Sequence, residues 1–140
     1  MDIKDCISFT SGNALCYYET IEDDQPRIRA MNSCFADESG FYFQTVAIKS
    51  VLEQLQKNPK IEVCFYKQEN MTGSILRISG EIEFLSDMKL KEKSLDNNQL
   101  MNNFEKMIEN SGLILFRISH GVANFWTMEN NLKPKEIINF

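Results

Sequence analysis

Apolar and polar side chains alternate along several short stretches of this chain, which is the pattern of strands with one buried face. In residues 60–66, for example, Ile61, Val63 and Phe65 share one face. The same reasoning predicts about seven strands, at residues 14–21, 26–36, 41–45, 60–66, 75–85, 113–119 and 122–128. Polar turns at residues 22–24, 37–40 and 120–121 separate neighbouring strands. We therefore expect antiparallel hairpins, including one that pairs residues 26–36 with 41–45.

Other stretches have the spacing of helices. These are residues 2–9, residues 50–58 and a stretch from residue 86 onward, the last as two helices broken near residues 97–98. In the second helix Val51, Leu52 and Leu55 form an apolar stripe, with Gln54 among the polar residues on the opposite side. Pro59 ends this helix, because the residue before a proline is disfavoured in helical geometry.

Strands that follow one another through short turns, with a single helix inserted, are typical of a closed antiparallel barrel. Gly80 lies in the middle of a predicted strand and suggests a bulge or a close approach of two backbones. We therefore expect a mainly β fold, a barrel with a few helices, built as one domain over residues 1–140.

Composition narrows the function classes. The net charge is −5 and the basic residues are scattered, which argues against binding to a nucleic-acid backbone. No stretch reaches the ~20 apolar residues of a membrane span, and no export signal opens the chain, so we expect a cytoplasmic protein. The four cysteines are widely spaced and His120 is the only histidine, so neither a metal site nor a disulfide framework is expected. His120 is expected in a turn before Gly121.

One group of polar side chains has the chemistry of a binding site. Its members are Arg27, Arg29, Gln44, Thr45, Lys49 and Ser50. If the hairpin forms, they converge at one end of the barrel. Lys49 and Ser50 would begin a helix, where free N–H groups favour an anion, and arginine suits phosphate. The residues alone therefore suggest a phosphate-bearing aromatic ligand, and a solvated basic patch explains them about equally well.

An ordered series of short motifs resembles the pyridoxamine 5′-phosphate oxidase-like family, the FMN-binding split-barrel group. The motifs are QPRIRAM at residues 25–31, GFYFQT at 40–45, Lys49, the stretch from Leu55 to Phe65 that contains NPKIEVCF, and RISGEI at 77–82. The resemblance implies a six-stranded antiparallel split barrel that forms a homodimer with FMN at the interface. By position, Arg29 matches the arginine that contacts the FMN phosphate. Gln44, Thr45 and Lys49 match further cofactor contacts, and Arg27 is a weaker candidate.

Several positions depart from the true oxidases of this family. Cys34 stands where they have a lysine for the substrate phosphate, Ile48 replaces one basic residue of an Arg-Lys pair, and Ile75 replaces a flavin-contacting glutamine. Nothing after Trp126 matches their substrate-binding arginine and histidine. FMN binding is therefore expected without oxidation of pyridoxamine phosphate.

The function expected is that of an FMN-dependent oxidoreductase that reduces a small electron acceptor, with NAD(P)H as a plausible donor. No side chain need act as an acid or base, because the flavin carries the redox chemistry. Short family members include nitroimidazole-resistance reductases and general stress proteins, and the chain resembles either group. Two alternatives stay open: a non-catalytic flavin or haem carrier or sensor on the same fold, and a structural or oligonucleotide-binding barrel without a cofactor.

Overall fold

The computed structural model describes residues 1–69, 71–96 and 112–140. One antiparallel sheet of eight strands makes up most of the protein. The strands are β1 (Leu15–Glu22), β2 (Gln25–Asn32), β3 (Phe35–Asp37), β4 (Gly40–Val46), β5 (Lys60–Lys67), β6 (Ser74–Leu85), β7 (Leu113–Trp126) and β8 (Ile138–Asn139). The described helices are α1 (Ile3–Ser11), α2 (Ser50–Lys57) and α3 (Met88–Asp96), with a 3-10 turn at Met128–Asn130.

The sheet curls into a split barrel. Its strand order is β2-β1-β5-β6-β7-β4-β3, with β8 beside β7, so β2 and β3 are the two ends of the path. The short link Ser33–Cys34 joins these ends, and the Cys34 amide donates to the Tyr42 carbonyl over 2.9 Å. The predicted mainly β split barrel is confirmed: six long strands form it, and β3 and β8 are short additions.

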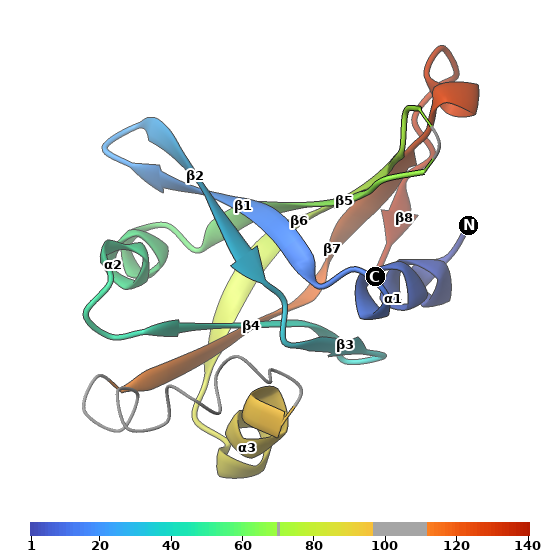
Figure 1. The fold of residues 1–140 in the computed structure, drawn as a ribbon. Helices are drawn as coiled ribbons and strands as arrows, with labels where there is room; N and C mark the ends of the chain where they lie inside the picture. The colour runs from blue at the N-terminus through green and yellow to red at the C-terminus, as the bar shows by residue number, and fades with distance from the viewer. Residues whose placement is uncertain (70, 97–111) are drawn as a thin grey trace.

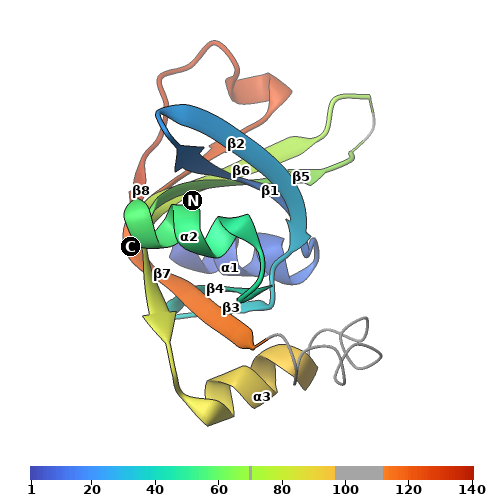
Figure 2. The ribbon, with the colours of Figure 1, turned by 90° about the vertical axis from the view of Figure 1, so that its left-hand side faces the viewer.

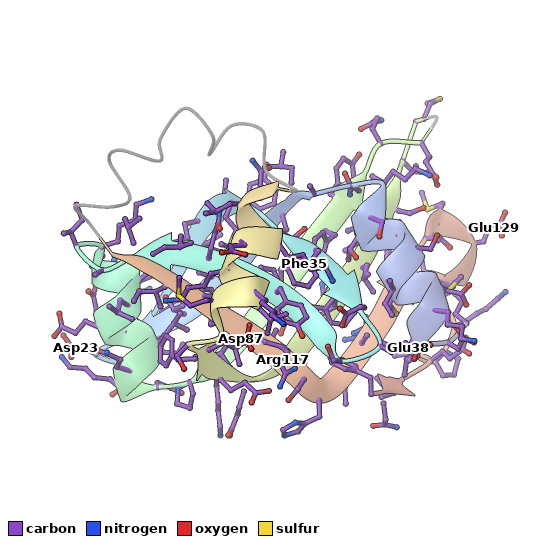
Figure 3. The ribbon with its side chains drawn as sticks, turned by 90° about the horizontal axis from the view of Figure 1, so that it is seen from below. Asp23, Phe35, Glu38, Asp87, Arg117 and Glu129 are labelled. Carbon is purple, nitrogen blue, oxygen red and sulfur yellow. The ribbon has the colours of Figure 1, made fainter. Side chains whose placement is uncertain are left out.

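The helices occupy different sides of this barrel. Figure 1 shows α1 and α2 at opposite ends and α3 below β4, and Figure 2 looks onto the end that α2 covers. From below, Phe35 and Arg117 lie close to α3 (Figure 3), where the Lys93 ammonium stands 4.0 Å from the centre of the Phe35 ring. Among the described residues, no helix is long and apolar enough to cross a bilayer.

Alternate side chains of the long strands fill the barrel interior, as the period of two requires. The fully buried members include Cys16, Val63, Phe65, Leu76, Ile78, Phe116 and Ile118. The rings of Phe43 and Phe116 stack with centroids 5.6 Å apart. Burying a side chain of this size is worth about 1.5–3 kcal/mol, so this core is the main source of stability.

Two predicted strand boundaries are wrong. Residues 26–36 do not form one strand that pairs with β4: β2 pairs with β1 along its whole length, and only Phe35–Asp37 pairs with β4. The predicted hairpin at residues 120–121 is absent, because β7 continues through His120 as one strand beside β6. The register between β6 and β7 shifts between Gly80 and Ile82, which confirms the bulge predicted at Gly80.

The helices lie close to their predicted limits, but the position of Gln54 differs from the prediction. Residues 3–11 and 50–57 are helical, close to the predicted limits, and the capping box of Asp2 and Asp5 explains where α1 begins. Gln54, which the sequence pattern predicts on the polar face of its helix, is instead buried with Val51 and Leu55. The second helix predicted after residues 97–98 lies outside the described residues.

Candidate functional site

A cavity of about 460 Å³ opens at the split of the barrel. Its lining comes from the inner face of β1, the end of β2, the end of β4 and the start of α2. The lining residues are Tyr18, Arg29, Ala30, Met31, Gln44, Thr45, Lys49, Ser50 and Val51. Five of the six residues singled out from the sequence therefore lie around one cavity, and Arg27 does not.

The chain brings these residues together by a different route from the predicted hairpin. β4 pairs with β7 and not with β2. The ends of β2 and β4 approach because the barrel closes through Ser33–Cys34, and because α2 packs against both β1 and β4. A turn in which the Lys49 amide donates to the Val46 carbonyl leads from β4 into that helix.

Arg29 is held in place by two neutral side chains. Its Nη1 donates to Thr20 Oγ1 over 2.6 Å, and its Nη2 donates to Gln54 Oε1 over 2.8 Å. The guanidinium carbon also lies 5.4 Å from the centre of the Tyr18 ring, within the range of a cation–π contact. Among the described side chains, no carboxylate forms an ion pair with Arg29.

Arg27 has a different environment. It is exposed, and its Nε donates to Glu22 Oε2 over 2.8 Å. The two arginines point to the same side of β2, yet only Arg29 reaches the cavity. Hydrogen bonds from Gln54 and Arg27 hold the pKa of the Glu22 carboxyl below its ordinary value.

Gln44 and Thr45 form the buried wall of the cavity, each less than a tenth exposed. Ser94 of α3 is fully buried behind them, and its Oγ lies 3.3 Å from Gln44 Oε1. The Ser94 hydroxyl also donates to the Lys91 carbonyl over 2.7 Å. These contacts limit the orientation of the Gln44 amide, and they connect the cavity to α3.

The mouth of the cavity carries the start of α2. Lys49 is the N-cap residue and Ser50 the first helical residue, and both are exposed. The Lys49 side chain makes no capping hydrogen bond. The first N–H groups of a helix have no partner within it, so this end of α2 attracts an anion together with the Lys49 ammonium.

The described lining of the cavity offers cationic, hydroxyl, amide and apolar groups, which suit the binding of an anionic ligand. Its lining contains no histidine or carboxylate. Burial raises the pKa of the Tyr18 phenol, although Arg29 opposes this, so the phenol stays neutral. His120 is exposed on β7, with its Nδ1 3.0 Å from Ser119 Oγ. No cluster of metal-ligating side chains occurs within residues 1–69, 71–96 and 112–140.

Sequence reasoning missed the two residues that orient Arg29. Thr20 is a buried polar residue in the inward phase of β1, after Cys16 and Tyr18, and that break in an apolar pattern is a usable signal. Gln54 stands three residues after Val51, at the spacing of the buried stripe, so its position already pointed inward. Both are buried and hydrogen-bonded to each other, with 2.7 Å between Thr20 Oγ1 and Gln54 Oε1.

Comparisons with known proteins agree with this architecture. A family model described as pyridoxamine 5′-phosphate oxidase matches residues 9–125. No curated protein matches the sequence.

Solved structures with the same fold include a NimC/NimA family protein from Clostridium acetobutylicum, with a TM-score of 0.79 and 22% identity over 98% of this chain and 92% of the other. A FAD-binding protein from Mesorhizobium loti has a TM-score of 0.67 and 15% identity over 89% and 94% of the two chains. The haem storage protein HutZ from Vibrio cholerae has a TM-score of 0.61 and 14% identity over 85% and 90%. At these identities, the likeness shows the shared fold.

Proposed function

The chain belongs to the pyridoxamine 5′-phosphate oxidase family, and from this membership and the cavity at the split of the barrel we propose that it binds FMN and acts as an FMN-dependent oxidoreductase. The observation that carries the proposal is Arg29, a cation fixed at the cavity by neutral partners. One solved structure of the same fold is described as a FAD-binding protein, which supports a flavin.

The residues present fit the phosphate of such a cofactor. Arg29 offers a planar group of donors that suits phosphate oxygens, and its charge is not neutralised by a described carboxylate. Lys49 and the N–H groups at the start of α2 lie around the same cavity and add positive potential. Together they would hold the phosphate.

The rest of the cavity fits a heteroaromatic ring with polar edges. Tyr18, Met31 and Val51 offer apolar surface, and Gln44 and Thr45 offer hydrogen-bonding groups on the buried side. A volume of about 460 Å³ lies within the range of small-ligand sites. When bound, the flavin would accept and deliver electrons, while the protein binds it, orients it and excludes water.

The substrate side differs from that of a pyridoxamine-phosphate oxidase. Cys34, which stands at the position of the substrate-binding lysine, is buried in a cluster with Tyr42 and Leu115. Burial raises the pKa of its thiol to about 12, so it is neutral and offers no charge to a phosphate. We therefore propose that the protein reduces a small electron acceptor, with a reduced nicotinamide as donor.

A homodimer with the cofactor near its interface is part of the proposal. The outward face of β1, β2 and β5 exposes Leu15, Tyr17, Ile28 and Tyr66, and Ile28 keeps 70% of its surface accessible. Several large apolar side chains exposed on one face of a sheet are typical of an interface. Glu19 lies directly opposite Glu62 on the same face, a like-charge pair that a positive group facing it from a second copy would stabilise. Sedimentation at micromolar concentration with FMN present should give a dimer, and a monomer would contradict it.

The alternative function is a flavin or haem carrier on the same fold, which the HutZ likeness favours. For haem, the position of His120 is unfavourable, since it lies on β7 and does not line the cavity.

Anaerobic photoreduction of the FMN-loaded protein, followed by addition of quinones, nitroaromatics and flavins, separates the oxidoreductase from the carrier. We expect rapid reoxidation by at least one acceptor and subsequent reduction by NADH or NADPH. A reduced flavin that no acceptor reoxidises would mean a carrier.

A further inference from the structure

We infer that Gln54 is a positioning residue that holds Arg29 in a fixed orientation while leaving its charge available to an anion. The inference rests on the proposed function for the identity of that anion, the FMN phosphate. Gln54 does not line the cavity and reaches it only through Arg29.

The geometry forms a chain of four side chains. Arg27 donates to Glu22 over 2.8 Å, Gln54 Nε2 donates to Glu22 Oε1 over 2.9 Å, and Gln54 Oε1 accepts from Arg29 Nη2 over 2.8 Å. The Glu22 carboxylate is thereby compensated by Arg27, on the side away from the cavity. Gln54 lies between that carboxylate and Arg29.

The amide group is the one side-chain end that suits both neighbours. Its NH₂ faces a carboxylate that needs donors, and its oxygen faces a guanidinium that needs an acceptor. A glutamate at this position would pair with Arg29 and neutralise it, and it would repel Glu22. Gln54 therefore lies between Arg29 and the Glu22 carboxylate.

Thr20 completes the orientation. Its hydroxyl donates to Gln54 Oε1 over 2.7 Å and accepts from Arg29 Nη1 over 2.6 Å. Both Thr20 and Gln54 are almost fully buried, and polar groups at such positions carry a cost unless they are hydrogen-bonded. Two amino groups of the guanidinium are thus fixed by neutral acceptors, and within the described part of the chain no carboxylate pairs with its remaining N–H groups.

The ligand-free protein tests the fixed orientation directly. In ¹⁵N NMR spectra, the Nη–H groups of Arg29, assigned by comparison with Arg29→Lys, should be resolved, because their hydrogen bonds slow rotation about the Cζ–Nη bonds. They should broaden or disappear in Gln54→Met and persist in the control Thr20→Ser, which keeps the hydroxyl. Absent Arg29 signals in the unaltered protein, or unchanged signals in Gln54→Met, would overturn the inference whether or not flavin binds.

The charge argument is tested with FMN and riboflavin, which share a ring and differ in the phosphate. At pH 8, Gln54→Glu should lose about 10- to 100-fold in affinity for FMN and no more than about twofold for riboflavin. Thr20→Val should also weaken FMN binding more than riboflavin binding. It is the variant to measure if Gln54→Glu does not fold. Equal losses for both ligands would mean a merely structural role and overturn the inference. If the unaltered protein binds neither ligand, the proposed function fails and the NMR result alone decides the role of Gln54.

Discussion

Gly80 and Gly121 face each other across β6 and β7, and neither position has room for a side chain. A Cβ on Gly121 would lie 2.2 Å from the Ser79 carbonyl oxygen, and one on Gly80 would lie 2.7 Å from the His120 carbonyl oxygen. The register between β6 and β7 shifts directly after this pair, between Gly80 and Ile82, and a bulge of this kind bends the strands. The two glycines therefore permit the close backbone contact through which the barrel curves.

Gly121→Ala should destabilise the protein by about 2 kcal/mol or more, because the clash is with backbone atoms that cannot move independently. Urea denaturation followed by circular dichroism measures the change in the free energy of unfolding. Gly12→Ala is the matched control, since the nearest atom to its added Cβ would be 3.9 Å away. We expect a change within about 0.5 kcal/mol there. Equal stability of the two variants would mean that β6 and β7 do not approach as described.

Lys49→Ala should weaken FMN binding about 10- to 150-fold and leave riboflavin binding within about twofold, since a charge-assisted hydrogen bond is worth about 1.5–3 kcal/mol. Fluorescence titration gives both dissociation constants. Lys57→Ala is the control, because Lys57 lies on the same helix outside the cavity and pairs with Glu53. Parallel losses for FMN and riboflavin in Lys49→Ala would refute its assignment to the phosphate.

The Glu22 carboxyl should titrate below its ordinary pKa in the folded protein, because Gln54 and then Arg27 donate to it. A depressed folded pKa stabilises the fold above the unfolded value of about 4.3, and this contribution is lost as the pH falls through the folded pKa. NMR titration of the Glu22 side-chain carbon measures it directly. Gln54→Met should move the pKa upward, and an unchanged value would show that the Gln54–Glu22 hydrogen bond is absent in solution.

Pyridoxamine 5′-phosphate should not be oxidised at a useful rate by the FMN-loaded protein. By the family resemblance, Cys34 stands where those oxidases have a substrate-binding lysine, and here it is buried with a neutral thiol. A peroxide assay with pyridoxamine 5′-phosphate in air tests this, with chemically reduced protein as the positive control for flavin reoxidation. Sustained peroxide production above the rate without substrate would contradict the assignment.

Much of this fold could be predicted from the sequence because the period of two is strong wherever one strand face is buried. The limits of the prediction lie where local signals and tertiary contacts disagree. His120 and Gly121 have the composition of a turn, yet Gly121 is needed for its contact with β6, which lies far away in sequence. Residues 26–36 read as one strand because Ser33 and Cys34 do not interrupt the pattern, although the chain changes partner there.

The sequence predicted most residues of the candidate site, and it missed those that depend on tertiary contacts. Arg29, Gln44, Thr45, Lys49 and Ser50 meet at one cavity, which the residue order alone suggested. The alternation along β2 does not by itself distinguish Arg27 from Arg29, since both occupy the same face, and only the family resemblance favoured Arg29. That distinction depends on Gln54 and Thr20, which come from α2 and β1 and reach only Arg29.

The central claim is that the cavity beside Arg29 binds FMN, and titration of the apoprotein with FMN tests it most directly. We predict saturable quenching of flavin fluorescence with one FMN per chain and half-saturation below about 50 µM at low ionic strength. The same titration with Arg29→Ala should require at least about tenfold more FMN. No quenching by the unaltered protein up to that concentration, or identical curves for the unaltered protein and Arg29→Ala, would contradict the account.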